Sequence, residues 1–106
     1  MLGIRSGDEH RFTGVWFILI GDRVFVRPWY DKPSGWRRAL LLEPRGSIRV
    51  GDREIPVRAR AVRGARLFDA VDAAYAAKYT TKASQKWVRG FSLARRRKTT
   101  TELLQR

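Results

Sequence analysis

Arginine and aromatic side chains crowd residues 24–38, and they are the strongest candidates for chemistry in the chain. A guanidinium group binds phosphate through paired hydrogen bonds, and an indole or phenol ring stacks on a flat ligand. This combination suits a nucleotide-like cofactor or a nucleic acid. The structural alternative is a solvated arginine face above tryptophans that pack in a core. The side chains expected to converge, where one strand ends and the next element begins, are Arg27, Trp29, Tyr30, Trp36, Arg37 and Arg38.

The last quarter of the chain holds over half of its excess positive charge. The net charge is +13, and residues 80–106 contribute 8 basic residues and 1 acidic residue, or +7. No acidic residue lies between Tyr79 and Glu102. Such a segment attracts polyanions, and its tryptophan could stack on a base; the alternative is a solvated loop. The candidate polyanion-binding residues are Lys82, Lys86, Trp87, Arg89, Arg95, Arg96, Arg97 and Lys98.

A third group lies in the stretch "AAYAAKYTT", where Tyr75 and Tyr79 share one face of a predicted helix and Lys78 lies beside them. The functional alternative is a ligand-facing role for two phenols and an amine. We favour the structural interpretation, in which the rings pack the helix onto a sheet and their hydroxyls reach its rim.

The residues needed for most other chemistry are scarce. The chain has no cysteine and a single histidine, His10, which we expect at the surface. The chain therefore lacks most of the side chains that metal sites of the usual His/Cys kind and nucleophilic catalysis require. The ten acidic residues fall mostly in predicted turns and caps, and no two are spaced as an acid/base pair on one element. The pattern disfavours hydrolysis by protein side chains.

The elements that position the first group begin with a strand over residues 12–20, apolar on both alternating faces and therefore expected to be buried on both sides. Gly21-Asp22 predicts a tight turn, and residues 24–27 form the return strand of the hairpin. Pro28 cannot donate to a ladder, so the strand must end or become an edge there.

Residues 30–35 form a predicted loop, and residues 36–42 then favour one or two helical turns ended by Pro44. Alternating Ile/Val and Arg residues over 48–61, with Gly51-Asp52 between them, predict a second hairpin with one apolar and one arginine-rich face.

The C-terminal half contains one strongly periodic helix, predicted over residues 68–79 with Asp69 and Asp72 in its first turn. Residues 80–92 are polar and contain Gly90, so we expect them to be irregular. Residues 93–98 form a predicted helical turn. Residues 99–104 read as a final strand in which at least one of two adjacent leucines is buried.

These elements predict an α+β fold that is mostly β: a small, partly open barrel of about five to six antiparallel strands with one main helix at 68–79. A length of 106 residues predicts a single domain, 1–106. The longest apolar run, residues 15–20, is far shorter than the ~20 residues of a membrane span. No secretory signal pattern opens the sequence, so we expect a cytoplasmic protein.

The ordered motifs "TGVWFILIGDRVFVRPW", "GWRRA", "SIRVGDREIPV", "DAVDAAYAAKY" and "ARRRKTTTELLQR" resemble the bacterial domain of unknown function 2255 family. That family is distantly similar to the flavin-binding split-barrel group of pyridoxamine-phosphate oxidases and deazaflavin-dependent nitroreductases. The resemblance implies a split β-barrel, a homodimer, and a site for flavin mononucleotide (FMN) or a deazaflavin (F420-like). On that basis Arg27, Arg37 and Arg38 would hold phosphate, and Trp29 and Trp36 would flank the ring.

Three functions therefore stay open at the level of sequence. The first is a flavin- or deazaflavin-binding module of the oxidoreductase type. The second is a non-enzymatic nucleic-acid binder that uses residues 82–98. The third is a structural or interaction module without a small ligand.

Overall fold

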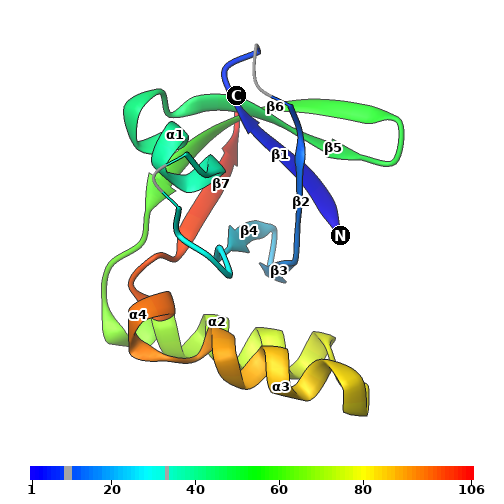
Figure 1. Ribbon diagram of the computed structural model, residues 1–106, viewed down its shortest axis with the longest axis vertical. Helices are drawn as coiled ribbons and strands as arrows, with labels where there is room; N and C mark the ends of the chain where they lie inside the picture. The colour runs from blue at the N-terminus through cyan, green and yellow to red at the C-terminus, as the bar shows by residue number, and fades with distance from the viewer. Residues whose placement is uncertain (9–10, 33) are drawn as a thin grey trace.

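The computed structural model describes residues 1–8, 11–32 and 34–106, so the expectation for His10 lies outside the described residues. Figure 1 shows strands gathered at one end of the molecule and two helices side by side at the other. The elements in chain order are β1 Leu2–Ser6, β2 Thr13–Val15, β3 Phe17–Ile20, β4 Arg23–Val26, α1 Trp36–Leu42, β5 Arg45–Val50, β6 Arg53–Ala61, α2 Ala65–Lys78, α3 Lys82–Phe91, α4 Ala94–Arg97 and β7 Thr101–Gln105.

The strands form one antiparallel sheet in the order β2-β1-β5-β6-β7-β4-β3. Its two edge strands, β2 and β3, are consecutive in the chain and are separated only by Trp16. The sheet therefore curls until its edges meet at this residue, which makes it a nearly closed barrel. The prediction of an α+β, mostly β barrel is confirmed.

The single strand predicted over residues 12–20 is divided in two. Val15 pairs with Leu2 of β1, whereas Phe17 pairs with Val26 of β4. One segment thus serves two different neighbours, and the ladder breaks where it changes partner. Burial on both sides was also wrong for this segment, because Leu19 is exposed.

The hairpins and α1 agree with prediction, and the strand count does not. β5 and β6 pair around the turn at Gly51-Asp52, and the buried Leu103 confirms the expectation for the last strand. The sheet has seven strands instead of five or six, because β1 was not predicted and because the strand predicted over residues 12–20 is divided into β2 and β3. Its sequence signal was short: Leu2 and Ile4 alternate with Gly3 and Arg5, and the structure buries Leu2, Ile4 and Ser6 on one face.

The helical half differs more from prediction. α2 begins at Ala65, so Asp69 and Asp72 lie beyond its first turn. The prediction that residues 80–92 are irregular is wrong, because α3 occupies most of this segment. Thr81 caps the start of this helix, because its Oγ1 accepts a hydrogen bond from the Ser84 backbone N–H at 3.2 Å.

Two apolar clusters hold the layers together. The first fills the barrel and is centred on buried residues such as Ile4, Val26 and Val57. The second joins α2 and α3 to the β3–β4 hairpin, with Phe25 and Tyr75 in its interior. The two helices therefore cover one end of the barrel, beside the point where it is split.

Candidate functional site

A cleft opens where the barrel fails to close. β3 and β4 pair up to Phe17 and Val26, and continuing this register by two residues would place Pro28 opposite Val15. Proline has no backbone N–H for a ladder, so pairing stops there as expected. The chain after β4 then diverges from β2, and a cavity of about 570 Å³ lies along this divergence.

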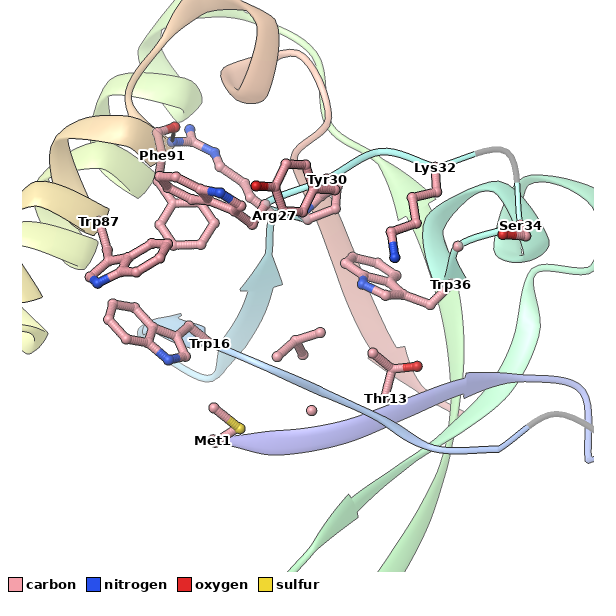
Figure 2. A pocket seen from close by; sticks show the side chains of 15 residues that line it. Met1, Thr13, Trp16, Arg27, Tyr30, Lys32, Ser34, Trp36, Trp87 and Phe91 are labelled. Atoms are coloured by element: carbon pink, nitrogen blue, oxygen red, sulfur yellow. Dashed lines mark hydrogen bonds between the residues drawn. The ribbon is translucent and has the colours of Figure 1, made fainter.

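All four tryptophans of the chain line this cleft. Figure 2 shows Trp36 and Lys32 on one side of the space, Trp16 and Trp87 on the other, and Thr13 of β2 near its base. Four residues of the first predicted group line the cleft: Arg27, Trp29, Tyr30 and Trp36. Trp16, Lys32 and Thr13 were not predicted there, and Trp87 was predicted only as part of the basic C-terminal segment. The full lining is Met1, Thr13, Gly14, Val15, Trp16, Arg27, Pro28, Trp29, Tyr30, Lys32, Ser34, Gly35, Trp36, Trp87 and Phe91.

Trp29 is clamped in place by its neighbours. The Arg96 guanidinium lies 3.7 Å from the centre of its ring and donates to the Trp29 carbonyl at 2.9 Å. Trp87 and Phe91 approach edge-on, with ring centres at 4.7 and 5.3 Å. Gly90 leaves room for the indole, because a Cβ there would lie 2.2 Å from it. The indole is therefore held in one orientation by the protein itself.

Trp16 is backed by Tyr79, whose ring stacks on it at 4.2 Å. The Tyr79 hydroxyl donates to the Phe17 carbonyl at 3.0 Å, and burial raises its pKa. The Tyr75 hydroxyl accepts from the Arg27 backbone N–H and donates to the Trp16 carbonyl. The structural interpretation of the two tyrosines is therefore confirmed: they fasten α2 to the strands.

Arg27, predicted to hold phosphate, is placed differently. Its side chain is completely buried and forms an ion pair with Asp72. Its remaining donors reach Thr100 Oγ1 at 2.8 Å and the carbonyls of Phe91 and Phe68 at 3.0 and 3.2 Å. Because these protein groups occupy the guanidinium, Arg27 has no free fork for a ligand. Its chemistry here is structural, and it lines the cleft only from behind.

Arg37 and Arg38 share one carboxylate, that of Asp31, at 2.7 and 3.1 Å. Of the two, Arg38 is the more accessible to solvent, with 47% of its side chain exposed. Arg37 lines neither the cleft nor the hollow described next. The structure thus separates two adjacent arginines that the sequence treated as equivalent.

A second, basic hollow of about 460 Å³ adjoins the cleft and shares Pro28, Trp29 and Tyr30 with it. Here the structure brings Arg38, from the first predicted group, beside Arg95 and Lys98 from the basic C-terminal segment. The sequence signal for this meeting was weak, since nearly sixty residues separate them. The lining is Pro28, Trp29, Tyr30, Asp31, Arg38, Arg95, Arg96, Lys98 and Thr99.

The remaining basic residues divide by environment. Arg96 is buried, which lowers its pKa, and its guanidinium is committed to Trp29 and the Gly90 carbonyl. Arg97 pairs with Asp69 and with Asp72, the latter at 3.0 Å. The other cations of the group are exposed: Lys82, Lys86, Arg89, Arg95 and Lys98.

Within residues 1–8, 11–32 and 34–106, no cluster of three metal-ligating side chains gathers. The helices in the same ranges include none that is long and apolar enough to cross a membrane.

Comparison with known proteins places the chain in a family. A search of the curated proteins finds no match. The profile of a family described as "Uncharacterized protein conserved in bacteria (DUF2255)" matches residues 4–103, from β1 to β7. The resemblance seen in the sequence motifs is therefore confirmed, and the chain belongs to the bacterial family DUF2255.

Proposed function

We propose that the tryptophan-lined cleft binds a flat, phosphorylated aromatic cofactor of the flavin or deazaflavin class. The observation that carries this proposal is the convergence of every tryptophan in the sequence on one open cavity. Indole faces are expensive to leave in water, and a flat ring that stacks on them removes that surface from solvent. The volume of about 570 Å³ lies within the usual range of small-ligand sites.

The adjoining hollow supports a phosphate-bearing ligand over an uncharged one. It begins at Tyr30, on the rim of the cleft, and presents Arg38, Arg95 and Lys98. A ring seated between Trp36 and Trp16 would extend a phosphate chain past Tyr30 toward these cations. Arg38 replaces Arg27 as the principal phosphate ligand in this proposal, because the Arg27 guanidinium is occupied.

The chain's own residues would bind and orient the cofactor and shield it from water. A flavin or deazaflavin would itself supply hydride-transfer chemistry, so a scarcity of acid/base side chains is compatible with an oxidoreductase. Lys32 lines the cleft beside Trp36 and would place a positive charge at the edge of the ring (Figure 2).

The first experiment combines an absorbance spectrum of the purified protein with thermal-shift titration of FMN and of a deazaflavin. We expect saturable stabilisation by one of them, of about 2.7 kcal/mol at a ligand concentration one hundred times Kd. A colourless protein whose melting temperature neither ligand changes would favour a structural module without a small ligand.

Arg38 and Arg37 provide a matched pair for the phosphate. Arg38→Ala removes a cation of the hollow, and we expect FMN affinity to fall about 10- to 150-fold while riboflavin affinity is unchanged, because a hydrogen bond to a charged group contributes about 1.5–3 kcal/mol. Arg37→Ala breaks the other contact to Asp31 and should leave both affinities unaltered. Equal losses in the two variants would remove the hollow from the proposal.

A further inference from the structure

The outward face of α3 carries a stripe of positive charge. Lys82, Lys86 and Arg89 are four and three residues apart, so successive turns place them on one side of the helix. The opposite side buries Ser84, Val88 and Phe91 against the rest of the protein. The three cations therefore point into solvent, on the side of α3 opposite its buried side chains.

Nothing within the described residues neutralises this stripe. α3 contains no acidic residue, and no carboxylate of the described chain lies within ion-pair distance of the three cations. Like charges four residues apart, as in Lys82 and Lys86, destabilise a helix. A run of uncompensated cations on one helix face attracts anions, so this face favours an anionic partner.

An aromatic ring borders the same face. A surface hollow of about 600 Å³ is lined by Lys82, Ala83, Gln85, Lys86, Trp87 and Arg89. Trp87 is 39% exposed, and the Lys86 amino group lies 5.3 Å from its ring centre. Trp87 lines this hollow together with the three cations, and it also lines the cleft.

We propose that the α3 face binds single-stranded nucleic acid, with phosphates along Lys82, Lys86 and Arg89 and an unpaired base against Trp87. Cations that follow the backbone beside an aromatic platform are the general arrangement for such binding. An unpaired base can reach the indole, whereas a base stacked within a duplex cannot. The three cations of this face lie outside the proposed cofactor site, and Trp87 is shared, because it lines both the cleft and the α3 hollow.

The test measures binding of a fluorescein-labelled oligothymidine of about twenty nucleotides by anisotropy over a series of salt concentrations. Neutralising three phosphates predicts a slope of about −2 in log K against log salt. The variant Lys82→Glu/Lys86→Glu/Arg89→Glu should bind at least 10-fold more weakly and lose most of that slope.

A control with the same change in net charge is Arg45→Glu/Arg53→Glu/Arg58→Glu. These exposed residues belong to the β5–β6 hairpin, at the opposite end of the molecule from α3 (Figure 1). We expect this control to retain most of the affinity. Equal losses in the two variants would show that net charge alone attracts the strand, and would overturn the α3 assignment.

Substitution of Trp87 tests whether the α3 face prefers single-stranded nucleic acid to a duplex. Trp87→Ala should weaken oligothymidine binding about 5- to 100-fold, the range observed for loss of a base-stacking aromatic. Binding of a duplex or of heparin should be little changed by this substitution. The proposal is overturned if duplex or heparin binds wild-type protein as tightly as the single strand, or if Trp87→Ala leaves oligothymidine binding unchanged. FMN titration of the triple α3 variant separates this result from the cofactor proposal, since that site should stay intact.

Discussion

Arg27 brings a positive charge into the interior, where protein groups satisfy it. Asp72 neutralises the charge, and a threonine hydroxyl and two carbonyls accept its other hydrogen bonds. The carbonyls belong to α2 and α3, so this one side chain ties the two helices to the end of β4. Its role is to hold the wall of the cleft in place.

Replacing Arg27 with Met should therefore act on stability. We expect the free energy of unfolding to fall by about 3–5 kcal/mol, because the Thr100 hydroxyl and the carbonyls of Phe91 and Phe68 lose their donor, while Asp72 keeps its ion pair with Arg97. Urea denaturation measures this loss. A variant that keeps wild-type stability but does not bind FMN where the wild-type protein does would contradict the structural role and restore Arg27 as a candidate ligand residue.

Gly90 yields a prediction with an unusual sign. Gly to Ala inside a helix normally stabilises by about 1 kcal/mol. At Gly90 the new Cβ would lie 2.2 Å from the Trp29 ring, so we expect Gly90→Ala to destabilise by about 1–3 kcal/mol.

The double variant Gly90→Ala/Trp29→Phe checks that cause, because phenylalanine lacks the outer indole atoms that the Cβ would meet. In the Trp29→Phe background, the Gly90→Ala substitution should become neutral or stabilising by thermal denaturation. Additive losses would mean that the clash lies elsewhere.

Residue types at the site were readable from sequence, but their partners were not. Trp29 and Trp36 were correctly placed together because they flank one predicted loop. Arg27 looked equivalent to Arg38 in sequence. Its ion pair is with Asp72, 45 residues later, and nothing in the local sequence predicts that contact. Trp16 and Trp87 reach the same cleft from a strand and a helix that only the tertiary fold brings together.

At the scale of elements, β7 is held in the sheet by a charge cluster. The Glu102 carboxylate accepts hydrogen bonds from the Arg23 guanidinium at 2.8 and 3.0 Å and from the Arg60 guanidinium at 2.5 Å. Arg23 lies on β4 and Arg60 on β6, the two strands that pair with β7. These bonds, above all the one from Arg23, lower the pKa of Glu102 from its ordinary 4.5 to about 2. The carboxylate is thus favoured in the folded protein.

A pH dependence of stability follows from this lowered pKa. The stabilisation from Glu102 is complete above about pH 4.5 and is lost as the pH falls toward 2, because the unfolded state takes up its proton first. We expect about 1–3 kcal/mol to disappear over this window. In Glu102→Gln the pH slope between 4.5 and 2 should flatten in acid titrations followed by circular dichroism; an unchanged slope would assign it to other carboxylates.

Elements were predictable where their signals were local. The β5–β6 hairpin has alternating residues and a Gly-Asp turn, and it appeared as expected. The division of this segment at Trp16 arises because β2 pairs with β1 and β3 pairs with β4. That choice of partners is tertiary, so the local sequence does not predict it. α3 was missed because Gly90 and the polar stretch suggested a loop, whereas Gly90 is required for contact with Trp29.

At the scale of the whole molecule, a homodimer remains a prediction. Support comes from α1, where Leu41 and Leu42 are 57% and 90% exposed, because adjacent apolar side chains of this size often mark an interface. Light scattering should then give twice the 12.3 kDa of the chain. Leu41→Ser/Leu42→Ser should shift the mass to that of a monomer, and a monomeric wild-type protein would contradict the prediction.

The split in the barrel is the feature on which the proposed function depends. One chain segment pairs with β1 and then with β4, Pro28 prevents the ladder from closing, and four tryptophans line the resulting cleft. The most direct test is equilibrium titration of FMN with the purified protein, followed by flavin and tryptophan fluorescence together. We predict saturable quenching of both signals with one FMN per chain. Quenching that grows linearly with concentration, as in simple collisions with exposed indoles, would contradict a cofactor site in this cleft.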